Sequence, residues 1–198
     1  MNYLAHIYLA QPNIESVCGN LMGDFMKGVS IDDLPEPIAK GVHNHRLVDR
    51  FTDNHPAVIA LKGKLSPARR RFSGVIADIV FDHLLIQHWT EYSDQNVATF
   101  IDQTYQQILS GRHYMNPRMD WVLMLMIEEN WLLSYQTQLG IEAIIERIAK
   151  RIRFKNELAG AMSEVSSLME QYDHAFQQLF PDLIQHVETN AIELTDSH

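Results

Sequence analysis

A short segment of the sequence, residues 41–56 (GVHNHRLVDRFTDNHP), brings together side chains that could bind a metal ion and an anion. If the segment is helical up to its last proline, His45, Asp49 and Asp53 recur every four residues, so one imidazole and two carboxylates lie along one face. That face can hold a divalent metal ion, and Arg46, one position further round the helix, would face a bound anion. A solvated helix face with incidental ion pairs would show the same spacing.

Further imidazoles and carboxylates lie in apolar surroundings elsewhere in the chain. They are His6 in LAHIY, Asp24 in LMGDFM, and Asp78, Asp82 and His83 in VIADIVFDHLLI. A carboxylate in such surroundings is costly without a cationic partner, which can be a side chain or a metal ion. Judged alone, a histidine in such surroundings is more often a buried, hydrogen-bonded core residue than a metal ligand. Inward-facing His and Asp side chains on several helices are how helical bundles build metal sites.

The types of donor limit the chemistry. With Cys18 as the single cysteine, a thiolate zinc site is excluded, and its mid-helix position favours packing over a nucleophilic role. Imidazole and carboxylate donors together suit Mn²⁺, Mg²⁺ or Fe²⁺. The sequence has no phosphate-binding glycine loop, no GxSxG motif and no HExxH motif, so nothing supports a nucleotide kinase, a serine hydrolase or a zinc protease.

Helical periodicity runs through almost the whole chain, and no useful stretch alternates like a strand. The pattern predicts an all-α fold, with a short apolar segment at residues 2–10 and helices at 14–28, 37–53, 56–65, 68–92, 96–109, 117–136, 141–154 and 157–180. A hydrophobic content of 46% supplies one core. Because we find no repeat and no linker, we expect residues 1–198 to form a single compact helical bundle.

The charge distribution indicates the kind of partner. A net charge of −9 opposes a general affinity for nucleic acid. Residues 40–71 nevertheless hold eight cations against two anions, a local balance of +6 that suits an acidic partner. No apolar run has the length of a membrane span, and the first residues lack the cations of a signal peptide, so we expect a cytoplasmic protein that binds no membrane.

Five segments in the first ~90 residues, NYLAHIYLA, GNLMGDF, GVHNHRLVDRFTDNHP, ARRRF and DIVFDHLLIQHW, resemble the acyl carrier protein phosphodiesterase family, also called acyl carrier protein hydrolase. The resemblance implies an enzyme that removes the 4′-phosphopantetheine arm from holo acyl carrier protein and regenerates the apo form. Because the family is regarded as an atypical member of the HD phosphohydrolase group, the resemblance also implies an HD-domain-like helical fold and a divalent metal, usually manganese.

The resemblance also implies roles for individual residues. The implied metal ligands are His6, Asp24, His45, Asp49, Asp82 and His83, and the implied catalytic residues are Arg46, Asp53 and Asp78. The sequence departs from the ordinary HD pattern because it has no adjacent His-Asp dipeptide, only the reversed pair at 82–83. Ligand identities therefore do not transfer from ordinary HD enzymes.

Carrier proteins of this kind are acidic, so we expect them to dock on a basic surface made of Lys62, Lys64, Arg69, Arg70 and Arg71. A solvated basic helix start would show the same residues. Two other functions stay open. An HD-type phosphohydrolase acting on a nucleotide would need the metal site without the basic surface, and a non-catalytic carrier-protein-binding module would need the basic surface without the metal. The sequence indicates no oligomeric state.

Overall fold

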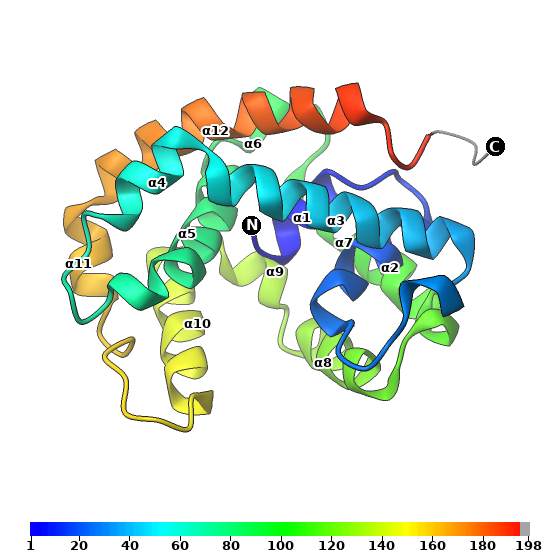
Figure 1. Cartoon of the computed structure of the whole chain (residues 1–198), viewed down its shortest axis with the longest axis horizontal. Helices are drawn as coiled ribbons and strands as arrows, with labels where there is room; N and C mark the ends of the chain where they lie inside the picture. Colours follow the sequence, from blue (N-terminus) through cyan, green and yellow to red (C-terminus); the bar gives the residue numbers. More distant parts are fainter. Residues whose placement is uncertain (195–198) are drawn as a thin grey trace.

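Two long helices, α3 (Glu36–Asn54) and α12 (Met169–Asn190), run side by side along the long axis of the molecule in the computed structural model, which describes residues 1–194 (Figure 1). The remaining helices are α1 (Tyr3–Tyr8), α2 (Ile14–Met22), α4 (Pro56–Lys62), α5 (Ser73–Gln87), α6 (Trp89–Tyr92), α7 (Val97–Ser110), α8 (Pro117–Glu128), α9 (Trp131–Ser134), α10 (Gln138–Arg151) and α11 (Met162–Ser167). Four short 3-10 helices are η1 (Gly23–Phe25), η2 (Ile31–Asp33), η3 (Arg70–Phe72) and η4 (Arg112–Tyr114).

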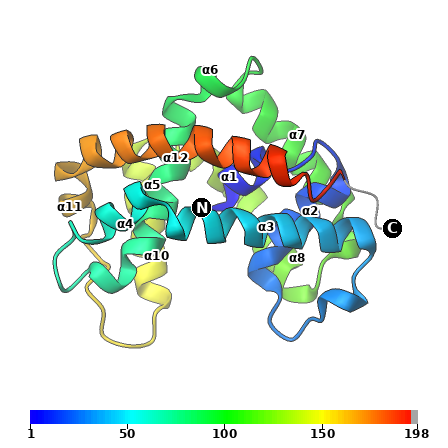
Figure 2. The same ribbon diagram turned by 45° about the horizontal axis from the view of Figure 1, so that its top comes forward.

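The helices gather at the two ends of this long pair. In both ribbon views α4, α5, α10 and α11 lie towards one end, and α2, α7 and α8 lie towards the other (Figure 2). Residues 1–194 contain no strand, so the expected all-α fold is confirmed. Organisation of residues 1–198 as a single domain stays a prediction, because residues 195–198 lie outside the described part. None of the helices within residues 1–194 combines the length and apolar character that crossing a bilayer requires.

Local sequence accounts for most of the helix starts. Asparagine side chains at positions 2, 13, 96 and 116 and a threonine at 137 accept hydrogen bonds from first-turn backbone N–H groups of α1, α2, α7, α8 and α10. Pro37 and Pro56 occupy first-turn positions of α3 and α4. The helix expected at 37–53 is confirmed with one more residue at each end.

Several expected helices are interrupted. The helix expected at 14–28 ends at Met22 and continues as η1, and the one expected at 68–92 is divided into η3, α5 and α6. The helix expected at 117–136 breaks at Asn130, whose φ of 49° is left-handed and ends α8. Of the helix expected at 157–180, residues 157–161 are not helical and the rest is divided into α11 and α12, and α12 continues past Pro181 to Asn190. These expectations were wrong because apolar spacing continues across local backbone breaks.

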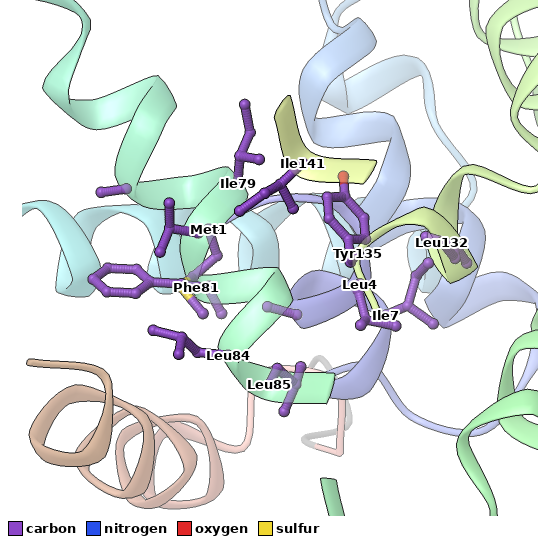
Figure 3. Close-up of a cluster of buried hydrophobic side chains, with 14 of the residues drawn as sticks. Met1, Leu4, Ile7, Ile79, Phe81, Leu84, Leu85, Leu132, Tyr135 and Ile141 are labelled. Atoms are coloured by element: carbon purple, nitrogen blue, oxygen red, sulfur yellow. The ribbon is translucent and has the colours of Figure 1, made fainter. Parts of the chain in front are cut away.

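The hydrophobic core centres on α1 and α5. Leu4 and Ile7 of α1 face Leu85 of α5, and Tyr135 and Ile141 close the cluster from the segment after α9 and from α10 (Figure 3). Helix α5 is buried on nearly every side, which agrees with its almost continuous apolar sequence. The core therefore fixes α1 firmly against α5 and leaves the opposite side of α1 to meet α3.

Helices α2 and α3 cross in backbone contact. A Cβ atom added at Gly19 would lie 2.5 Å from the carbonyl oxygen of Ile38 and 2.8 Å from the Cα of Gly41, so glycine is required at the crossing. Beside it, the side-chain amide of Asn44 donates to the Oδ1 of Asn20 over 3.0 Å. This close crossing sets the position of the polar face of α3.

Candidate metal centre

His6, His45 and Asp49 bring their donor atoms together at the contact between α1 and α3. The Nε2 of His6 lies 3.2 Å from Asp49 Oδ1, and the Nε2 of His45 lies 3.1 Å from Asp49 Oδ2. One donor atom from each residue lies within 4.8 Å of the others, so the three side chains, called the triad below, could hold a metal ion. His45 and Asp49 are four residues apart and lie on one face of α3, as the sequence predicts. The contact of His6 with them depends on how α1 packs against α3.

The two imidazole rings are held by close packing. Their centroids lie 3.9 Å apart with an interplanar angle of 16°, and both side chains are almost fully buried. The ring of His45 lies directly on the backbone of Gly23, where any added Cβ would collide with it. The Nδ1 atoms of His6 and His45 are buried and have no hydrogen-bond partner within residues 1–194, and Nε2 of His6, although 3.2 Å from the Asp49 carboxylate, lacks the geometry of a hydrogen bond to it. Buried polar atoms are usually satisfied, so these nitrogens indicate a missing ligand.

Electrostatics keeps His6 and Asp49 in the protonation states that a metal needs. Burial lowers the pKa of His6 to about 3, against the opposing effect of the nearby Asp49 carboxylate. Burial by itself would raise the pKa of Asp49, but the adjacent His45, His6 and terminal ammonium outweigh it and hold the pKa well below its usual range. The imidazole of His6 is therefore neutral and the carboxylate ionised near pH 7, which are the forms that coordinate a metal ion.

Two more predicted carboxylates border the triad. Asp24 Oδ1 lies 3.8 Å from His45 Nε2, and the side chain is 48% exposed. Partial burial of the Asp24 carboxylate raises its pKa, and the nearby His45 opposes this effect. Asp78 Oδ1 accepts from the buried ammonium of Met1 over 2.9 Å, and the same ammonium lies 3.4 Å from Asp49 Oδ1. The structure thus places both predicted residues at the edge of the triad.

Asp82 and His83 have protein partners outside the triad. Asp82 is fully buried, and its two oxygens accept from the backbone N–H groups of Leu4 and Ala5 over 2.8 and 3.1 Å. Burial raises the pKa of Asp82 to about 7, against the lowering effect of these hydrogen bonds. The Nδ1 of His83 lies 2.6 Å from the carbonyl oxygen of Tyr135. Both side chains position α1 and the chain after α9, and their expected role as ligands stays a prediction.

The expected stripe on α3 does not continue to its third member. Asp53 is exposed, and its Oδ1 accepts from Lys62 Nζ over 3.0 Å. Its carboxylate is not part of the donor group formed by the triad. Arg46 is exposed beside His45 and makes no ion pair within residues 1–194, so its guanidinium is free to meet an anion.

Two members of the expected basic surface, Arg69 and Arg71, also contact other parts of the protein. Arg69 pairs with Glu164 at 2.5 Å and donates to the carbonyl oxygens of Glu157 and Ala159 over 2.9 and 3.1 Å. Arg71 donates to the carbonyl oxygen of Lys155 over 3.0 Å and lies over two phenylalanine rings. These side chains fasten the segment that connects α10 to α11, because backbone carbonyls there need donors.

The remaining members of the basic surface divide into paired and unpaired cations. Lys62 pairs with Asp53 at 3.0 Å. Lys64 and Arg70 are exposed, and neither forms an ion pair within residues 1–194. Docking of a carrier protein on these five residues stays a prediction, and Lys64 and Arg70 are the two of them whose side chains form neither a hydrogen bond nor an ion pair within residues 1–194.

Sequence reasoning missed two residues that position the triad. Asn44, next to His45, is buried and links α3 to the end of α1 through the Leu9 carbonyl oxygen at 3.3 Å. Gly23 admits the His45 ring. A polar residue preceding a candidate ligand, and a glycine beside a candidate carboxylate, were the available signals, but neither identifies its tertiary partner.

Comparisons with a family model and with known proteins point to the same family. A family model described as acyl carrier protein phosphodiesterase matches residues 1–183. Proteins of the same description match from Serratia proteamaculans (32% identity over 93% of this chain and 96% of that protein), Klebsiella pneumoniae (30%, over 97% and 100%) and Photorhabdus laumondii (29%, over 95% and 96%). No solved structure matches the chain, so the expected likeness to HD domains stays a prediction.

Proposed function

Because the chain belongs to the acyl carrier protein phosphodiesterase family, we propose that it hydrolyses the phosphodiester joining 4′-phosphopantetheine to a serine of holo acyl carrier protein. The products are the apo carrier protein and free 4′-phosphopantetheine. The observation that supports a metal-dependent reaction is the triad, in which buried imidazole nitrogens without partners lie against an ionised carboxylate. The cytoplasmic location expected from the sequence stays a prediction.

The residues of the triad fit a divalent metal ion. His6 and His45 would each bind the ion through an imidazole nitrogen, and Asp49 would bind it through a carboxylate oxygen. This set of donors suits Mn²⁺ and also admits Mg²⁺ or Fe²⁺. When bound, such an ion supplies a Lewis acid that polarises a phosphate oxygen and lowers the pKa of water. The packing of the two rings and of Gly23 holds the donors in place before any ion arrives.

Residues around the triad supply the other requirements of phosphodiester hydrolysis. Arg46 is exposed next to His45, and its guanidinium would neutralise charge on the non-bridging phosphate oxygens. Asp24 borders the triad with a raised pKa, which suits a carboxylate that takes the proton of the attacking water. Asp78 would hold the neighbouring ammonium and so fix the edge of the site.

The decisive experiment measures the mass of a holo carrier protein after incubation with the purified enzyme. We expect the mass to fall by that of the phosphopantetheine group, the reaction to stop on chelation, and Mn²⁺ to restore it. A panel of nucleotides in the same assay tests the other phosphohydrolase interpretation. Full activity after exhaustive chelation would show that the reaction needs no metal ion. Hydrolysis of a nucleotide but not of holo carrier protein would show that the carrier protein is not the substrate.

Substitution of Asp49 by Asn should remove both metal binding and activity. Loss of the charged donor should weaken Mn²⁺ binding in calorimetry and reduce hydrolysis by at least about 100-fold. Asp53→Asn is the matched control, because Asp53 lies on the same helix but pairs with Lys62 at the surface. If the Asp53 variant loses as much activity as the Asp49 variant, the triad is not the centre of the reaction. The face of His45, Asp49 and Asp53 predicted from the sequence would then be the better description of the site.

A further inference from the structure

A cavity of about 130 Å³ lies between the start of α1, the chain around α9, and α10. Its walls include the aromatic rings of Tyr3, Trp131 and Tyr135 and the aliphatic side chains of Ile144 and Ile148. Nothing in the chemistry described above uses this cavity. Its mixture of apolar walls and a few polar groups is typical of sites that bind small organic molecules.

Two hydroxyl groups in this cavity have no protein partner. Neither Tyr3 nor Tyr135 donates a hydrogen bond from its hydroxyl within residues 1–194, although the side chain of Tyr135 is 2% exposed. Neither hydroxyl oxygen is fully buried, so each is accessible to a ligand that enters the cavity. The cavity therefore presents two donors in positions where a ligand can accept.

The cavity adjoins the triad. Its lining begins at Asn2 and Tyr3, directly after the Met1 ammonium that lies 3.4 Å from Asp49. Tyr3 of the lining also lies on α1, the short helix that carries His6 of the triad. A ligand whose phosphate lies at the triad can therefore extend along the start of α1 into the cavity.

Cationic side chains line the cavity from α10. Arg151 is exposed and forms no ion pair within residues 1–194. Arg147 pairs with Glu129 at 2.7 Å and lies 5.0 Å from the centroid of the Trp131 ring. Only one of the two guanidinium groups is neutralised, so the lining favours a ligand with negative charge close by.

We propose that this cavity binds the pantoyl part of the 4′-phosphopantetheine arm, the part that directly follows the phosphate. This inference rests on the proposed function and adds a binding site to it. The two methyl groups of the pantoyl unit lie against Ile144 and Ile148, while its hydroxyl and amide carbonyl accept from Tyr3 and Tyr135. Arg151 faces the phosphate end of the arm. Recognition of the arm here would distinguish this substrate from other phosphodiesters.

The test measures binding of free pantetheine, which lacks the phosphate, to the full-length metal-free protein by NMR titration. Wild-type protein should bind it, Ile148→Trp should fill the cavity and weaken binding at least about 10-fold, and Tyr135→Phe should weaken it about 3- to 10-fold through one lost hydrogen bond. Ala143→Trp adds the same ring to an exposed position of α10 and should bind as the wild type does. The KM for holo carrier protein should rise in the first two variants only.

Thermal unfolding of each variant checks that the fold is retained, and Tyr135→Phe serves if the larger substitution does not fold. Equal pantetheine binding by wild type and both cavity variants would overturn the inference, as would binding of a nucleoside in place of pantetheine. A wild-type enzyme that hydrolyses holo carrier protein without binding pantetheine contradicts the inference alone. A wild-type enzyme that does not hydrolyse holo carrier protein contradicts the proposed function itself.

Discussion

Two histidines from different helices are stacked 3.9 Å apart beside an ionised carboxylate, and both are almost fully buried. Two imidazolium ions at that distance would repel each other strongly in a medium of low polarity. Burial and the neighbouring positive groups keep His6 neutral, and the carboxylate of Asp49 stays ionised. Adding a proton to His6 in the folded, metal-free protein is therefore unfavourable.

The contribution of His6 to the stability of the metal-free protein should fall as the pH is lowered from 6.5 to 5. An unfolded His6 has a pKa near its ordinary value of 6.5, whereas the folded value is about 3. Below pH 6.5 an unfolded His6 binds a proton that the folded one does not, so this contribution decreases by up to about 1.4 kcal/mol per pH unit. Asp82, whose folded pKa is about 7, acts in the opposite direction and is present in both proteins, so urea denaturation should show the wild type losing stability relative to His6→Gln as the pH falls.

His43→Gln is the matched control for that experiment. His43 is exposed on the same helix as His45, and within residues 1–194 it forms no hydrogen bond, ion pair or ring contact with the triad. This variant should keep the wild-type dependence on pH. If His6→Gln and His43→Gln show equal slopes, burial of His6 does not control the acid response.

For single residues, the sequence predicts side-chain contacts within one helix better than contacts between two helices. The contact of His45 with Asp49 follows from helical spacing. The position of His6 beside them depends on how α1 packs against α3, which no local pattern encodes. Asp53 satisfies the same spacing rule, yet α4 offers it Lys62 as a partner, so the rule alone does not select the ligands.

Among the elements, the crossing of α2 and α3 determines where the triad forms. Gly19 and Gly41 allow the two backbones to touch, and Gly23 at the end of α2 allows the His45 ring to lie on η1. Without these close approaches α3 would move away from α2. Small residues on two helices are thus a requirement of the site as well as of the fold.

Gly41→Ala should destabilise the protein by about 1–3 kcal/mol, because overpacking at a tight contact forces the helices apart. An added Cβ would lie 2.7 Å from the Cα of Gly19. For a chain of this size the midpoint of thermal unfolding should fall by roughly 2–4 °C per kcal/mol. Differential scanning calorimetry of the metal-free protein measures the change.

Gly74→Ala is the matched control for that substitution. Gly74 lies in α5, where an added Cβ meets nothing within 4 Å, so alanine should leave stability unchanged or increase it by reducing the freedom of the unfolded chain. If both variants lose the same stability, the close crossing of α2 and α3 is not the reason.

Helix existence was predictable and helix boundaries were not. Apolar spacing identified the segment of every long helix, because each buries one face against the core. The breaks at η1, at Asn130 and between α11 and α12 depend on turns that apolar spacing passes over. The expected helix at 68–92 illustrates the effect, since residues 70–72 form η3, and Arg69 before it and Arg71 within it donate to carbonyl oxygens of the segment after α10.

For the whole molecule, the main issue is how a protein of net charge −9 would attract an acidic carrier protein. A local excess of cations can direct an encounter even against the overall charge, because screening limits each interaction to about 8 Å at physiological ionic strength. Arg69 and Arg71 are used to hold the chain between α10 and α11, so replacing them would change stability together with charge. Lys64 and Arg70 are the cations whose removal tests docking alone.

Replacing Lys64 and Arg70 together by Ser should weaken the encounter with holo acyl carrier protein and leave the triad unchanged. The value of kcat/KM should fall much more than kcat, and its dependence on salt should become shallower than in the wild type, because fewer charges contribute to association. The control, Lys40→Ser with Arg112→Ser, makes the same change in net charge at two cations that already pair with Glu36 and Asp120. If both double variants show the same loss and the same salt slope, only net charge matters and these two cations form no docking surface. If kcat falls alone, Lys64 or Arg70 acts in the reaction, and the carrier protein binds elsewhere.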